Sequence, residues 1–284
     1  MRLWSTAAAA VLPWALLAAA EPQQKLSPFG SVHRLTMVPV SEARAEKPEL
    51  AVEPGVSYLI RADSMTILMD TGLNRKGEHP SPLLRNLETL HIDPARINML
   101  FFSHLHADHT GGMPQFSISR GPVALGPVPA FAPAPLQPSK FNPEPGVQVL
   151  TQPRVLASGI ASIGPLPGPL GIREQALAIH VNGKGIVLFT GCGHQGLAAM
   201  VKRARELFTE PIYGVVGGLH LQKGGPEADE TMKALKALNP GVLGISPHDT
   251  SEEVIKRFQD EFGERYLEIL VGRELSLGGS GRYY

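Results

Sequence analysis

Apolar residues along the second half of the chain fall into two alternating kinds of segment. Short apolar runs predict buried strands at residues 176–180, 186–189, 212–216 and 242–245. Longer segments with apolar residues at helical spacing predict helices at residues 197–207, 228–238 and 252–262. Thr250 or Ser251 would cap the last of these helices. Strands that alternate with helices predict an α/β fold, in which helices cover layers of sheet.

The first half of the chain contains further short apolar runs, at residues 31–40, 56–61, 65–69 and 97–102. One helix is predicted over residues 80–95, where leucines recur at helical spacing. Residues 121–170 are rich in proline and glycine, so we expect a long surface loop with short strands there. Long loops of this kind often cover active sites.

The most informative polar positions directly follow the apolar run at residues 97–102. Residues 103–112 read SHLHADHTGG, which places His104, His106, Asp108 and His109 within six positions. Imidazole and carboxylate are ligands that zinc, iron and manganese accept. Residues two apart in an extended chain point to the same side, so His104 and His106 can bind one ion together. Asp108 and His109 follow the start of a turn and can face a second ion.

Other motifs occur in a fixed order around this run. DTG at residues 70–72 follows an apolar strand, EQAL occupies residues 174–177, and FTGCGH, GGLHL and PHDT begin at residues 189, 217 and 247. Over about residues 50 to 275, the chain resembles the metallo-β-lactamase superfamily. It is similar to the branch that includes 7,8-dihydropterin-6-methyl-4-(β-D-ribofuranosyl)aminobenzene-5′-phosphate synthase and proteins described only as metal-dependent hydrolases. The resemblance implies an αββα sandwich, with two mixed sheets flanked by helices.

The resemblance also implies further metal ligands. Many relatives carry a Gly-His-Thr-x-Gly ligand motif, but residues 172–177 contain no histidine, and His194 can fill that corner from the neighbouring strand. Cys192 stands where many relatives have an aspartate that bridges two metals, and it either binds metal or only lines the pocket. His248 matches the last histidine of the superfamily and would bind the second metal.

Two more residues have roles that the resemblance leaves open. His220 belongs to the branch pattern as a ligand, a proton donor or a substrate contact. Asp70 would orient a ligand histidine, because metal-bound imidazoles commonly donate their second N–H to a carboxylate, although Asp-x-Gly is also a good turn sequence. The other histidines lie outside the motifs and are expected to be structural or exposed, namely His33, His79, His91 and His180.

Composition limits the possible partners and the location. The 284 residues include 26 basic and 26 acidic side chains, so no basic field favours nucleic acid. Residues 1–20 read as a secretory signal peptide, or alternatively as an uncleaved anchor, and 21–30 as a linker before a single domain at 31–284. We therefore expect a periplasmic or secreted protein without stable membrane insertion after signal cleavage. Cys192 is the only cysteine, so no internal disulfide can form.

The sequence favours a metal-dependent hydrolase that uses one or two zinc ions, with iron or manganese as alternatives, to generate hydroxide as the nucleophile. Asp108 and His220 are the catalytic candidates. We expect a small-molecule substrate with an ester, phosphodiester or related bond. The glycine-rich turn at 193–196 opens a helix, whose N–H groups would receive an anionic group of that substrate. The alternatives are a pterin-related synthase or cyclic phosphodiesterase, and a non-catalytic periplasmic protein that binds metal or ligand.

Overall fold

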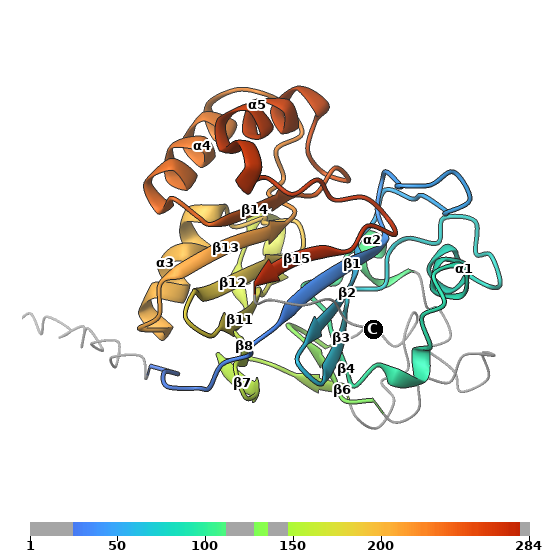
Figure 1. Cartoon of the computed structure of the whole chain (residues 1–284), viewed down its shortest axis with the longest axis horizontal. Coiled ribbons are helices and arrows are strands. Elements are labelled where there is room, and N and C mark those ends of the chain that lie inside the picture. Colours follow the sequence, from blue (N-terminus) through green and yellow to red (C-terminus); the bar gives the residue numbers. More distant parts are fainter. Residues whose placement is uncertain (1–24, 112–127, 136–146, 279–284) are drawn as a thin grey trace, which may run out of the picture.

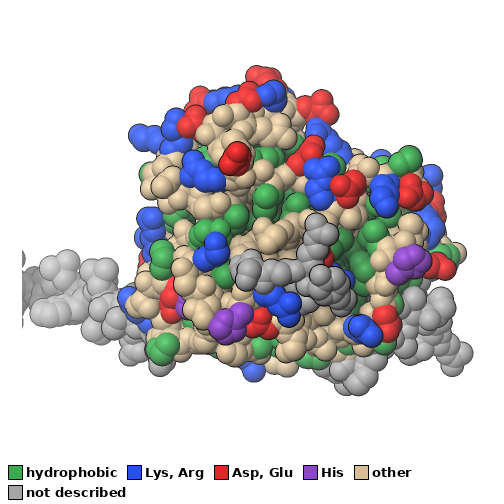
Figure 2. Space-filling view, viewed as in Figure 1, with side chains coloured by type: hydrophobic (Ala, Val, Ile, Leu, Met, Phe, Trp, Pro, Cys, Tyr) green, Lys and Arg blue, Asp and Glu red, His purple; other side chains and the backbone are tan. Residues whose placement is uncertain are grey.

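The computed structural model of the chain describes residues 25–111, 128–135 and 147–278. The predicted signal peptide at 1–20, part of the linker, and residues 121–127 and 136–146 of the predicted surface loop lie outside these residues. Within them, no helix is long and apolar enough to cross a membrane. On the face drawn in Figure 2, acidic and basic side chains are interspersed rather than grouped by sign.

Two mixed sheets form the centre of the molecule (Figure 1). The seven-stranded sheet has the order β15-β1-β2-β3-β4-β5-β6, with parallel pairing from β3 to β6. Its strands are β1 (Leu35–Ser41), β2 (Ser57–Ala62), β3 (Met65–Met69), β4 (Met99–Phe101), β5 (Ala130–Ala132), β6 (Val147–Val149) and β15 (Leu275–Gly278). This confirms the predicted strands of the first half, although the first begins at Leu35 rather than residue 31.

The six-stranded sheet has the order β14-β13-β12-β11-β8-β7, with parallel pairing among β12, β13 and β14. Its strands are β7 (Arg154–Ala157), β8 (Ile160–Ser162), β11 (Leu177–Val181), β12 (Gly185–Thr190), β13 (Ile212–Gly217) and β14 (Val242–Ile245). A separate short hairpin pairs β9 (Leu166–Pro167) with β10 (Arg173–Glu174). The proline- and glycine-rich segment thus does contain short strands where it is described.

Among the described residues, five α-helices flank or connect the sheets: α1 (Pro82–Thr89), α2 (Ala107–Thr110), α3 (Leu197–Leu207), α4 (Pro226–Leu238) and α5 (Glu252–Phe262). Of the two caps expected for the last helix, the structure uses Ser251, which accepts the Val254 N–H. The helix predicted over 80–95 is shorter, because His91 adopts a left-handed backbone (φ 54°) and Pro94 begins a new 3₁₀ turn.

Successive residues within a strand are apolar, rather than alternating with polar ones, because both faces of each sheet are buried. On β12, Val187 and Phe189 pack in the cluster between the sheets, whereas Ile186 and Leu188 pack against the layer of α3, α4 and α5. On the other sheet, Leu59 of β2 packs in the cluster that includes α1. The result is the predicted αββα sandwich.

Candidate metal centre

The His-x-His-x-Asp-His segment follows β4 and continues into α2. Backbone contacts hold its end: the Thr71 N–H donates to His109 O at 2.8 Å, and the Val56 N–H donates to Asp108 O at 3.0 Å. The segment is therefore fixed against the ends of neighbouring strands of the first sheet. His104 and His109 are fully buried, while Asp108 and His106 are more accessible.

Three histidines form the first group of possible ligands. His104, His106 and His194 offer nitrogens that all lie within 4.8 Å of one another. Nε2 of His194 is 3.3 Å from Nε2 of His104. His194 comes from the turn after β12 and is the third histidine of this group.

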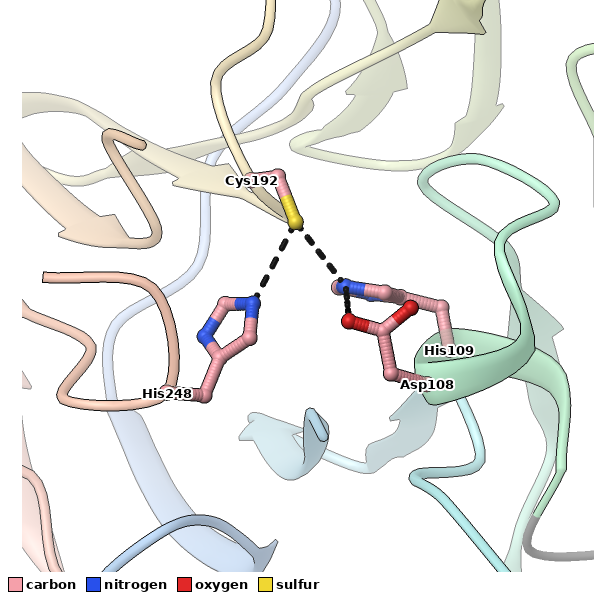
Figure 3. Close-up of side chains that lie close together, drawn as sticks. All are labelled: Asp108, His109, Cys192 and His248. Atoms are coloured by element: carbon pink, nitrogen blue, oxygen red, sulfur yellow. Dashed lines mark hydrogen bonds and ion pairs between the residues drawn. The ribbon is translucent and has the colours of Figure 1, made fainter. Parts of the chain in front are cut away.

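A second group contains Asp108, His109, Cys192 and His248 (Figure 3). Cys192 Sγ lies between two rings, 3.1 Å from His109 Nε2 and 3.2 Å from His248 Nε2. The Asp108 carboxylate is 3.8 Å from His109 Nε2. Cys192 also belongs to a third group, with His194 and His220, so its sulfur lies next to both main groups.

Asp70 contacts the first motif from behind. Its Oδ2 accepts the Nδ1–H of His109 at 2.7 Å and the hydroxyl of Ser103 at 2.6 Å. The Ser103 oxygen is 3.0 Å from His104 Nδ1. Because the Nδ1 atoms of both histidines are engaged, their Nε2 atoms face the centre, as the expected orienting role of Asp70 requires.

A similar series of hydrogen bonds, which the sequence did not predict, orients His248. Ser246 Oγ is 2.6 Å from His248 Nδ1 and donates to the carboxylate of Glu42, which is fully buried on the segment after β1. Tyr58 also donates to Glu42, at 3.0 Å. Burial raises the pKa of Glu42 to about 7, against the lowering effect of these hydrogen bonds. Among these residues, only Ser246 could have been predicted from the sequence as a partner of His248, because it lies two residues before it.

His220, like His106, is exposed, and 45% of its side chain is accessible to solvent. Its backbone is left-handed (φ 54°), and its N–H donates to Asp249 Oδ2 at 2.9 Å. Its ring lies 4.6 Å from that of His194, between centroids. Asp249, which the sequence did not predict as a partner, thus fixes the backbone of the loop that places His220 beside His194.

The expectation that the glycine-rich turn receives an anionic substrate is wrong for the N–H groups of Gly193 and His194. Both donate at 2.9 Å to the buried carboxylate of Glu174, as do the N–H groups of Gly191 (3.1 Å) and Cys192 (3.0 Å). The Gly196 N–H donates to the Gly193 carbonyl at 2.8 Å. The Glu174 side chain and the Gly193 carbonyl of the protein itself therefore occupy these donors.

The donor set fits a divalent metal ion such as zinc, iron or manganese. Burial lowers the pKa of His104 and of His248 well below the usual value, and burial with the nearby histidines lowers that of His194 to about 4. These rings are neutral near pH 7, as ligands must be. Burial opposes charge on His109, but the Asp70 carboxylate outweighs it and raises the pKa to about 9.

Burial also raises the pKa of the Cys192 thiol, and nearby carboxylates add to the effect. A metal ion must therefore displace protons from His109 and Cys192 when both bind it. We expect about two protons to be released per fully loaded protein at pH 7, and Zn²⁺ affinity to rise between pH 7 and 9. Calorimetric titration of metal-free protein in buffers of different ionisation enthalpy measures this release. Cys192→Ala should reduce it by about one proton, and equal release from both proteins would contradict this account.

The four histidines outside the motifs, His33, His79, His91 and His180, do not join the ligand groups found among the described residues. His180 has a structural contact, since its Nδ1 lies 2.7 Å from the Gly30 carbonyl oxygen.

Known proteins resemble this chain in sequence. Residues 50–204 match the sequence model of the metallo-β-lactamase superfamily. The chain is 29% identical over 271 residues to a 7,8-dihydropterin-6-methyl-4-(β-D-ribofuranosyl)-aminobenzene-5′-phosphate synthase of Methanocaldococcus jannaschii, which covers 77% of this chain and 88% of the relative.

Solved structures share the fold. A metal-dependent hydrolase of the β-lactamase superfamily superposes with a TM-score of 0.64 at 21% identity, over 86% of this chain and 99% of the other. A diphosphatase from the PhnP family superposes with a TM-score of 0.53 at 15% identity, over 86% and 97%.

Proposed function

Since the chain belongs to the metallo-β-lactamase superfamily, we propose that it is an exported metal-dependent hydrolase that acts on an ester, phosphodiester or related bond of a small molecule. The observation that carries this proposal is the pair of ligand groups joined by Cys192. A non-catalytic binding protein would not need Asp108 and His220 at the accessible side of such a centre.

His104, His106 and His194 would hold one ion, and Asp108, His109 and His248 a second, with Cys192 between them. When bound, zinc or a similar ion lowers the pKa of a coordinated water and polarises the substrate oxygen. Asp108 can accept a proton from the attacking water, because its side chain is 32% exposed at the edge of the second group. His220, half exposed and fixed through its backbone by Asp249, lies beside His194 and can donate a proton to the leaving group.

A pterin-related synthase or cyclic phosphodiesterase is the second candidate. It is favoured by the 29% identity to the dihydropterin synthase of M. jannaschii. The signal-like residues 1–20 argue against a cytosolic pterin pathway.

The test uses the full chain, expressed with residues 1–20 and purified without added metal from the periplasmic fraction. We expect a mature N-terminus after Ala20, one or two zinc ions per chain by elemental analysis, and turnover in a panel of esters, lactones, β-lactams and linear and cyclic phosphodiesters. Turnover of cyclic phosphodiesters alone would favour the second candidate. Bound metal without turnover anywhere in the panel would favour a binding protein, and a chain without metal would refute the proposal.

A further inference from the structure

One buried carboxylate holds the turn that supplies ligands to both groups. Cys192 belongs to the second group and His194 to the first, and the two residues are separated only by Gly193. Gly193 has a left-handed backbone (φ 71°), a conformation that glycine adopts easily because it has no Cβ. The directions of the two side chains therefore depend on what fixes the backbone of this turn.

We propose that Glu174 is a positioning residue that fixes this turn, so that Cys192 Sγ and His194 Nε2 face the centre. All four consecutive N–H groups from Gly191 to His194 donate to its carboxylate, three of them to Oε1. A carboxylate has two oxygens that accept several hydrogen bonds, so it can satisfy the whole turn at once. The inference rests on the proposed function, because it assumes that metal binds at the centre.

Glu174 comes from a segment of the chain that supplies no metal ligand. The residue lies at the end of β10, in the segment 172–177 that lacks a histidine ligand. A second contact ties the same hairpin to the turn, since Gln195 Nε2 donates to the Leu166 carbonyl of β9 at 2.9 Å. The segment 172–177 thus offers no histidine ligand itself. Its Glu174 carboxylate instead holds the turn that carries the ligand candidate His194.

Glutamine at position 174 would break this arrangement while keeping the shape of the side chain. It offers one acceptor oxygen, and its amide N–H₂ would face a backbone N–H donor in a buried place. We expect Zn²⁺ titration of the metal-free full chain, against a competing chelator, to give 10–100-fold weaker binding for Glu174→Gln than for the unchanged protein, about the effect of losing an outer contact of a metal site. In the Co²⁺-loaded protein, the absorption band from the thiolate of Cys192 should weaken as well.

Ser81→Ala is the matched control. Ser81 is also fully buried and accepts a backbone N–H, that of Leu84 at the start of α1, but it supports no ligand. It should lower the melting temperature without changing Zn²⁺ affinity or the Co²⁺ band. A Glu174→Gln protein with the affinity and band of the unchanged protein would overturn the inference, whereas an unchanged protein that binds neither ion would instead refute the proposed function.

Glu174→Asp keeps the negative charge and shortens its reach by one methylene group. It should bind Zn²⁺ with an affinity between those of the unchanged protein and Glu174→Gln. Should Glu174→Gln not fold, the aspartate variant carries the test, and an unchanged Zn²⁺ affinity of that variant would overturn the inference.

Discussion

Replacing His104 and His106 together by alanine is expected to abolish hydrolysis and to remove metal from the first group. The two residues supply two of its three imidazoles, and the remaining His194 cannot hold an ion alone. Loss of an outer contact already costs 10–100-fold in metal affinity or activity, so we expect the double variant to lose at least about 100-fold in kcat/KM. Elemental analysis should find less metal per chain.

The control for this pair is His33→Ala, which removes an exposed histidine that lies outside the ligand groups. It should keep the metal content and the kinetics of the unchanged protein. Because His104 is fully buried, circular dichroism and thermal melting must show that the double variant is folded. A folded double variant with its metal content and all hydrolytic activity intact would refute the hydrolase mechanism.

The sequence predicts those parts of the site that neighbouring residues encode. His104 and His106 follow a short buried strand, so their side chains had to emerge together at its end. His194 and His248 each follow a predicted strand, and parallel strands bring such ends to one edge of the sheet. The α/β class followed from the alternation of strand-like and helix-like apolar runs, whereas the αββα sandwich was implied by the resemblance to the family.

The contacts that the sequence did not predict join segments far apart in the chain. Glu42 reaches Ser246 across 204 positions, and no local pattern marks Glu42 as a buried partner of the centre. Glu174 illustrates the same limit with a different result. The glycine-rich turn has the composition of an anion-binding turn, but the anion is a side chain from another strand, which the fold alone brings into contact.

Asp70→Asn tests how the first motif is held in its metal-binding form. Asp70 Oδ1 accepts the Ser103 N–H at 2.7 Å, while Oδ2 accepts from Ser103 Oγ and His109 Nδ1. Asparagine has one oxygen, so either Ser103 or His109 would meet an N–H₂ group. If His109 meets it, the ring must accept at Nδ1 and carry its proton on Nε2, the nitrogen that faces Cys192.

We therefore expect Asp70→Asn to weaken Zn²⁺ binding 10–100-fold and to lower the free energy of unfolding by about 1–3 kcal/mol, the effect of leaving one buried polar group without a partner. Asp63→Asn is the matched control, because Asp63 also has a left-handed backbone (φ 50°, against 58° for Asp70) and accepts the N–H groups of His33 and Arg34. It lies at an exposed turn away from the centre, so it should leave Zn²⁺ affinity unchanged. Equal Zn²⁺ affinity of the two variants would mean that Asp70 serves the turn after β3 and does not orient His109.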